Sequence, residues 1–183
     1  YRSHSLDLID FSNRHFYKGR LQLLPHFDRA NDTEPGIEFR KIEGIWEKQQ
    51  NQVEANEVVS IIKKILQKDP DKQLGVVTFN AMQQQLILDL MDEVNFELPE
   101  NLFVKNIENV QGDERDVILF STAYGPDEKG KVMMQFGSLN AAGGENRLNV
   151  AITRAREKVI VVSYLSPAQL KVADPQNDEP KLL

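Results

Sequence analysis

Two runs of four consecutive apolar residues constrain the fold of this chain most strongly. They are residues 117–120 (VILF) and 159–162 (VIVV), and both are rich in the β-branched side chains that favour strands. A strand in which every residue is apolar has no face suited to water, so it must be covered on both sides. Strands of this kind are typical of parallel sheets that lie between two layers of helices. The two runs therefore predict the centre of an α/β fold.

Helical periodicity separates these runs and recurs along the chain. Between them, residues 145–156 carry Leu148, Ile152 and Ala155 at helical spacing. Segments with helical and strand patterns also alternate along the rest of the chain. Helices are expected at 5–17, at 53–67 and around Ile87 and Met91. Strands are expected at 39–45, at 74–79 and from Phe103 onward. This order is typical of βαβ units and predicts a mostly parallel sheet with helices on both faces. We expect one domain over residues 1–183, with an irregular tail at 167–183.

Composition narrows the chemistry that the chain can perform. It contains no Cys, which excludes disulfides, thiolate zinc sites, iron–sulfur clusters and Cys nucleophiles. Its net charge of −6 excludes a surface that is cationic throughout, although a local basic site stays possible. No apolar run approaches the ~20 residues that cross a bilayer, and no signal segment opens the chain. We therefore expect a cytoplasmic protein with no membrane partner. Because the first residue is Tyr1 and not Met, we also expect a piece of a longer protein.

A phosphate-binding loop is the first site to seek in such a fold. Residues 125–131 (GPDEKGK) have the G-x-x-x-x-G-K spacing, but Val132 stands where a Ser or Thr hydroxyl would bind magnesium. The residues that follow do not open a helix, so no helix N-terminus would face a phosphate. This segment is predicted to be a hairpin rich in turn-forming residues.

Two groups of charged residues are better candidates. Asp113, Glu114 and Asp116 could bind magnesium as in a nuclease, or could form an ordinary acidic turn before a strand. Arg147 and Arg154 are seven residues apart on the helix expected at 145–156, which would place them on one face about 10 Å apart. Two guanidiniums on a rigid element suit a phosphate or carboxylate, and a solvated helix face is the alternative.

Two longer sequence strings carry a family resemblance. Residues 110–121 (VQGDERDVILFS) and 147–156 (RLNVAITRAR) closely resemble motifs V and VI of the superfamily 1 helicases. Within that superfamily they are most similar to the branch of the nonsense-mediated-decay helicases and their bacterial multidomain relatives. Residues 1–4 (YRSH) resemble motif IV, and residues 75–80 (GVVTFN) resemble a strand and loop that touch the nucleic-acid backbone. The matches follow the family's order and extend over nearly the whole chain.

This resemblance implies the second of two RecA-like motor domains, a fold of the P-loop NTPase type. ATP would bind in the cleft between the two domains. The phosphate loop and the Mg²⁺ ligands would belong to the first domain, upstream of Tyr1, so no metal ligand is expected here. The implied partners are that first RecA-like domain and single-stranded DNA or RNA. The implied activity is ATP-dependent helicase or translocase action by the complete protein, and the isolated chain is expected to be inactive.

The resemblance also implies roles on the nucleotide side of the domain. Tyr1 would stack on the adenine and Arg2 would reach the γ-phosphate. Gln111 and Gly112 would lie at the nucleotide, where the absence of a side chain on Gly112 lets the backbone approach. Glu114 would accept a hydrogen bond from the ribose or order the γ-phosphate site.

The remaining implied roles belong to motif VI and to the nucleic-acid strand. Arg154 would be the arginine finger that stabilises charge on the transferring phosphoryl group, and Arg147 would brace the carboxylates of motif V. Thr78 and Asn80 would hold phosphates of the single strand without reading its sequence. Two alternatives stay open, a metal-dependent nuclease built on the acidic cluster and a non-catalytic module that senses nucleotide.

Overall fold

A five-stranded, all-parallel sheet forms the centre of the protein in the computed structural model, which describes residues 3, 5–20, 35–94, 96, 98–132, 136–166 and 169. The strands lie in the order β1-β5-β4-β2-β3. Their bounds are β1 Ile37–Lys41, β2 Leu74–Thr78, β3 Leu102–Asn106, β4 Arg115–Ser121 and β5 Ala155–Ser163. The two apolar runs lie in β4 and β5, which pair with each other, as expected for a strand core buried on both faces.

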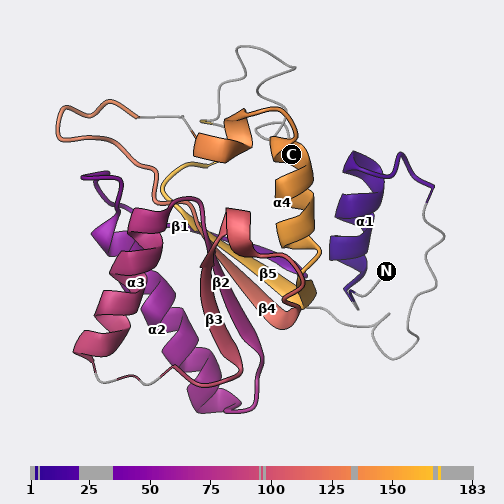
Figure 1. Ribbon diagram of the computed structural model, residues 1–183, viewed down its shortest axis with the longest axis horizontal. Coiled ribbons are helices and arrows are strands. Elements are labelled where there is room, and N and C mark those ends of the chain that lie inside the picture. Colours follow the sequence, from indigo (N-terminus) through magenta and orange to yellow (C-terminus); the bar gives the residue numbers. More distant parts are fainter. Residues whose placement is uncertain are drawn as a thin grey trace.

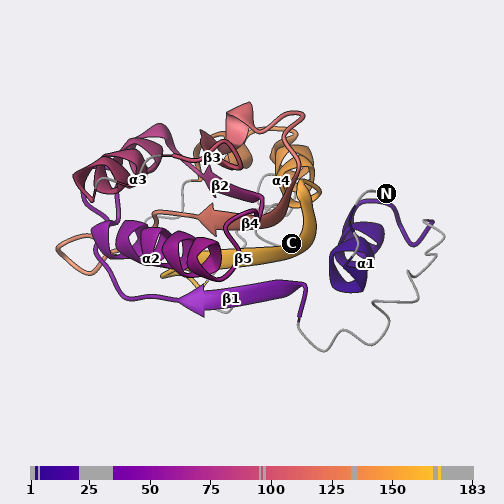
Figure 2. The ribbon, with the colours of Figure 1, turned by 90° about the horizontal axis from the view of Figure 1, so that it is seen from below.

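Helices cover both faces of this sheet (Figure 1). Their bounds are α1 Leu6–His15, α2 Gln52–Lys68, α3 Ala81–Glu93 and α4 Gly144–Ile152, with short 3₁₀ helices η2 at Ile107–Asn109 and η3 at Gly137–Asn140. The helices α2 and α3 pack on one face, and α4 packs on the other. Helix α1 lies beside the end of the sheet where the strands begin (Figure 2). Among the described residues, every helix is too short or too polar to cross a membrane.

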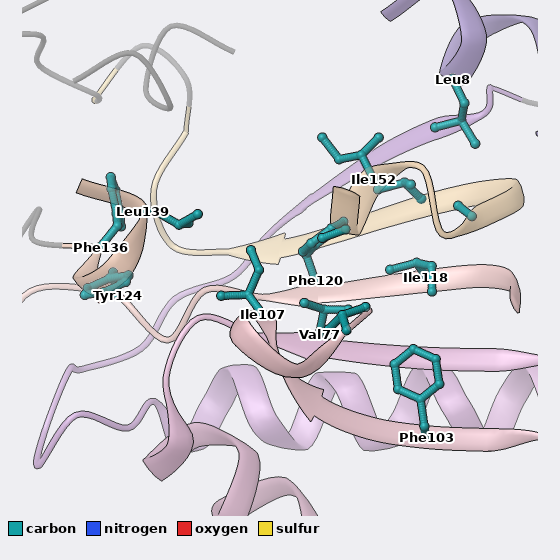
Figure 3. Close-up of a cluster of buried hydrophobic side chains, with 14 of the residues drawn as sticks. Leu8, Val77, Phe103, Ile107, Ile118, Phe120, Tyr124, Phe136, Leu139 and Ile152 are labelled. Carbon is teal, nitrogen blue, oxygen red and sulfur yellow. The ribbon is translucent and has the colours of Figure 1, made fainter. Parts of the chain in front are cut away.

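The alternation of side chains along each strand produces two apolar cores. Val77, Ile118 and Phe120 point to the side of α4 and α1 (Figure 3). Val76 and Leu119 point to the opposite side and pack against α2 and α3. Residues 117–120 of β4 are all buried, which confirms the expectation of a strand with no solvent face. In β5 three of the four residues of the second run are buried, and Val161 is half-buried. All five residues of β2 are buried as well.

The helix expected at 145–156 is too long at its C-terminal end. In the structure α4 stops at Ile152, and the backbone N–H of Arg154 donates to the Ala151 carbonyl in a tight final turn. The Arg154 carbonyl then accepts a hydrogen bond from the N–H of Arg115 (3.0 Å), and Ala155 begins β5. Pairing with β4 therefore overrides the helix propensity of the residues that follow Thr153. The expectation that Arg147 and Arg154 share one helix face is wrong.

The strand expected at 39–45 is also displaced. Strand β1 ends at Lys41, opposite Ser163 at the end of β5, so no partner strand continues beyond this point. The chain then bends through Gly44, whose Cα lies so close to the Asn51 side chain that a Cβ would stand 2.3 Å from Asn51 Oδ1. The helix expected at 53–67 and the strand at 74–79 are confirmed as α2 and β2. The tail expected at 167–183 falls outside the described residues except at Gln169.

Candidate nucleotide and nucleic-acid sites

Glu114 and Arg154 form an ion pair at the edge of the sheet where β4 and β5 begin. The register of these strands places Arg115 opposite Ala155, so the residues that precede them also lie side by side. The Arg154 Nη1 atom lies 3.7 Å from Glu114 Oε1, and the two side chains are 20% and 13% exposed. Motifs V and VI, which are far apart in the sequence, are thus joined at the edge of the sheet where the strands begin. We call this edge the amino edge.

The backbone of the α4–β5 turn holds the Arg154 guanidinium in a fixed direction. Its Nε donates to the Val150 carbonyl (3.0 Å), and its Nη2 donates to Thr153 Oγ1 (3.4 Å). A guanidinium has five N–H donors in a planar fork, so donors remain for an anion that approaches this edge. The arrangement can therefore receive a phosphate with little loss of side-chain freedom.

The acidic cluster is divided among separate cations. Asp113 pairs with Lys105 (2.6 Å) and Asp116 with Arg156 (3.5 Å), while Glu114 pairs with Arg154. On an extended segment Glu114 and Asp116 point to one side and Asp113 points to the other, so the three carboxylates do not converge on a common point. Within the part of the chain that the structure describes, no group of three or more His, Cys, Asp or Glu could hold a metal ion. This geometry does not favour the nuclease alternative.

The turn before β4 carries the other expected nucleotide residues. Gln111 and Gly112 are exposed. Gly112 has φ +90°, and a Cβ at this position would meet no atom within 4 Å. A positive φ favours glycine, so the turn shape requires it and leaves backbone open to a ligand. Arg147 is exposed on the first half of α4, whereas Tyr1 and Arg2 lie outside the described residues.

The segment with phosphate-loop spacing is a hairpin, as predicted. Pro126 and Val132 form an antiparallel bridge, and the N–H of Asp127 donates to the Lys131 carbonyl (2.9 Å). The Asp127 carboxylate accepts from the N–H groups of Lys129 (2.9 Å) and Lys131 (2.8 Å). Two amides that a phosphate would need are therefore already bonded to an internal anion.

The residues expected to bind nucleic acid lie at the opposite edge of the sheet, where β2 ends. Thr78 is fully buried, and its hydroxyl donates to the Asn80 carbonyl (2.9 Å). Asn80 is half-buried and caps α3, with its Oδ1 accepting from the N–H of Gln83 (2.8 Å). Thr78 therefore shapes the loop from inside, and Asn80 is the member of the pair that reaches the surface.

A buried carboxylate beside this loop was missed by the sequence analysis. Glu54 lies in the first turn of α2 with 0% exposure. Its Oε1 accepts hydrogen bonds from Ser121 Oγ (2.7 Å) and from the N–H of Ala123 (2.7 Å). Burial raises the pKa of Glu54 from 4.5 to about 7, and the hydrogen bonds from the segment after β4 oppose this rise. The signal available in the sequence was the Asn51-x-x-Glu54 spacing of a helix start.

An all-parallel sheet covered by helices on both faces, with an arginine–carboxylate pair where two central strands begin, defines a RecA-like α/β domain. A solved structure has this fold: the crystal structure of the C-terminal domain of a possible DNA helicase from Lactobacillus plantarum WCFS1 aligns with a TM-score of 0.53. The alignment covers 96% of each chain at 13% sequence identity, a likeness in fold.

Sequence comparison defines the family more narrowly. Residues 1–166 match the family described as AAA domain (AAA_12), and the chain belongs to this family. It is 41% identical over 174 residues to the uncharacterized ATP-dependent helicase MG140 of Mycoplasma genitalium, and this alignment covers 87% of this chain and 15% of that protein. It is 29% identical over 116 residues to regulator of nonsense transcripts 1 of Caenorhabditis elegans, and this alignment covers 61% of this chain and 10% of that protein. The resemblance to the C-terminal domain of superfamily 1 helicases is confirmed.

Proposed function

We propose that this chain is the C-terminal motor half of an ATP-dependent superfamily 1 helicase or translocase, with Arg154 as its arginine finger. The observation that carries the proposal is the ion pair of Arg154 with Glu114, which joins motifs V and VI at the edge of the sheet. The chain spans about 15% of the length of its Mycoplasma relatives, so the complete activity needs residues beyond this domain.

The amino edge supplies one side of the nucleotide cleft in this proposal. ATP, with Mg²⁺ held by the first RecA-like domain, supplies the phosphoanhydride bond whose cleavage drives the motor. The Arg154 guanidinium stabilises the negative charge that develops on the transferring phosphoryl group. Glu114 holds that guanidinium in place before the cleft closes. Gly112 and Gln111 provide exposed backbone and an amide side chain next to the nucleotide, with Tyr1, Arg2 and Arg147 completing the set expected from the family resemblance.

The opposite edge of the sheet, where the strands end, binds single-stranded DNA or RNA in this proposal. We call it the carboxyl edge. Asn80 and the first turn of α3 contact phosphates, an interaction that carries no sequence information. The two ligands occupy opposite ends of the same sheet in this proposal, and the domain moves along the nucleic-acid strand when the cleft opens and closes. A net charge of −6 fits a motor that grips few phosphates at a time.

Substitution of Arg154 in the intact protein tests this proposal. An arginine finger contributes about 10³-fold or more to kcat. Arg154→Ala should therefore lower the ATPase rate stimulated by nucleic acid by about that factor, and should change the nucleotide Kd far less, because the interaction is strongest in the transition state.

The matched control is Arg40→Ala. Arg40 also pairs with carboxylates, Glu38 (2.6 Å) and Glu57 (3.2 Å), but it lies on β1 at the side of the sheet. This variant should keep the wild-type rate. An ATPase rate that is unchanged in Arg154→Ala would remove the role assigned to this residue. Absence of ATP hydrolysis in the wild type would favour the module that only senses nucleotide.

A further inference from the structure

A cluster of buried polar side chains connects four elements at the carboxyl edge of the sheet. We call it the carboxyl-edge cluster, and its members are at most 7% exposed. They come from the start of α2, the first turn of α3 and the ends of β4 and β5: Asn51, Glu54, Gln83, Ser121, Thr122 and Ser163. Buried polar groups of this number need mutual hydrogen bonds to be tolerated, so their positions depend on one another.

The start of α2 departs from the usual capping arrangement in one respect. Asn51 Oδ1 accepts from the N–H of Glu54 (3.1 Å), as an N-cap does. In a capping box the Glu side chain would return to the N–H of the N-cap residue. Here the Gln83 Oε1 atom takes that N–H (2.8 Å), so the Glu54 carboxylate is directed towards β4.

Glu54 fixes the bend where the chain leaves β4. Its Oε1 accepts from Ser121 Oγ and from the N–H of Ala123, both at 2.7 Å. Ala123 has φ +68°, a left-handed conformation that is strained for a residue with a Cβ and must be held by its surroundings. The next residue, Tyr124, is buried and packs edge-on against Phe136 (4.8 Å between ring centroids). The carboxylate thus determines where the segment after β4 turns.

Gln83 extends the same network to the loop that precedes α3. Its Nε2 donates to Ser121 Oγ (3.1 Å) and to the Asn51 carbonyl (3.2 Å). Its backbone N–H donates to Asn80 Oδ1 (2.8 Å). A continuous path of hydrogen bonds therefore runs from Glu54 through Ser121 and Gln83 to Asn80.

We propose that Glu54 is a positioning residue for single-strand binding, because through Ser121 and Gln83 it fixes the Asn80 loop relative to the bend at Ala123. This inference rests on the proposed function, in which the carboxyl edge binds nucleic acid. It assigns to Glu54 no contact with the strand, since the side chain is fully buried.

Stability alone does not explain the Glu54 side chain at this point. The hydrogen bonds to its carboxylate come from the uncharged side chains of Ser121 and Thr122 and from the N–H of Ala123. Gln83 and Ser163 bond to Ser121 and Thr122 in turn, and both are uncharged, so none of these residues supplies a counter-charge. A buried charge without a cation partner reduces stability relative to a neutral group of the same shape. What the Glu54 side chain provides is one oxygen that accepts from two donors, Ser121 Oγ and the N–H of Ala123, and this geometry holds the two loops together.

The test uses two substitutions of Glu54 in the intact protein and measures the Kd of a fluorescein-labelled single-stranded oligonucleotide, in a thymidine and a uridine form. Glu54→Ala removes both acceptors and should weaken binding about tenfold, the factor that corresponds to one lost buried hydrogen bond. Glu54→Gln keeps a carbonyl oxygen for Ser121 and Ala123 and should stay within about twofold of wild type. The nucleotide Kd should be unchanged in both variants, because the nucleotide lies at the other edge.

Ile62→Ala is the matched control for lost packing. Ile62 is fully buried in α2 and belongs to the apolar core on the same face of the sheet. At a temperature where all variants are folded, it should keep the wild-type Kd for the oligonucleotide despite its lower stability. Gln83→Met cuts the link between the two loops without changing Glu54 and should weaken binding as Glu54→Ala does, which preserves the test if Glu54→Ala does not fold.

Several outcomes would overturn the inference. Wild-type binding by both Glu54→Ala and Gln83→Met would show that the cluster does not position the loop. An equal loss in Ile62→Ala would show that stability alone matters. Wild-type protein that binds neither oligonucleotide would overturn the proposed function itself, and this inference with it.

Discussion

Glu54 should make the stability of this domain depend on pH between its two pKa values. The pKa of this carboxyl is 4.5 when unfolded and about 7 in the fully buried site. Between these values the folded state binds more protons than the unfolded state, so the free energy of unfolding falls as the pH rises. The stabilising effect is complete below about pH 4.5 and is lost above about pH 7. This direction is opposite to that of a surface carboxylate held by a salt bridge.

The magnitude follows from the shift in pKa. Each unit corresponds to 1.36 kcal/mol, so the rise of Glu54 to about 7 corresponds to about 3 kcal/mol. Glu54→Gln removes the titration and keeps a carbonyl acceptor for Ala123. The difference in unfolding free energy between this variant and wild type should therefore move by about 3 kcal/mol in favour of the variant from about pH 4 to about pH 8.

Urea unfolding at a series of pH values measures this difference. Trp46, the single Trp of the chain, stacks near Tyr124 with 6.5 Å between ring centroids, so its fluorescence reports on the carboxyl edge. Taking the difference between two proteins removes the titrations that they share. Curves of stability against pH that run parallel for wild type and Glu54→Gln would refute the reasoning.

Two further predictions concern the nucleotide edge. Glu114→Gln in the intact protein should slow ATP hydrolysis and leave the oligonucleotide Kd unchanged, because it weakens the hold on Arg154 at one edge only. If the wild type instead cleaves single strands in the presence of magnesium and this variant does not, the nuclease alternative would be supported. Lys131→Ala should leave ATP turnover at the wild-type level, since the hairpin amides already bond Asp127, and a large loss of turnover would show that the hairpin binds phosphate.

The apolar pattern of the sequence was sufficient to predict most of the fold. The continuous runs in β4 and β5 are short and rich in β-branched residues, which favours buried strands. Helix α2 has an uninterrupted apolar stripe that ends before Asp69 and Pro70. The end of β1 could not be predicted in the same way. Ile42 and Glu43 suit a strand as well as the residues before them, and the strand stops because its neighbour β5 stops.

The two residues on which the site proposals depend show where sequence reasoning reached its limit. Arg154 was recognised from motif VI, but the surrounding Arg, Ala, Glu and Lys residues favour a helix, so its place in a turn between α4 and β5 required the strand pairing to be known. Glu54 stands at a helix start, where a carboxylate is ordinary. It is buried against Ser121 and Ala123, which are distant in the sequence, and no local pattern encodes these contacts.

Strand β4 has a mechanical consequence for the motor proposed here. It runs from Arg115 to Ser121, seven residues that span about 20 Å, and hydrogen bonds to β2 and β5 prevent it from bending or shortening on its own. One end adjoins Arg154 and the other adjoins Glu54. In the proposed motor the strand would therefore connect the edge assigned to ATP rigidly to the edge assigned to nucleic acid, and a displacement of one end would move the other by rotation of the whole domain. The length of each step would then be set by the angle between the two motor domains, with no need for a change of shape inside this one.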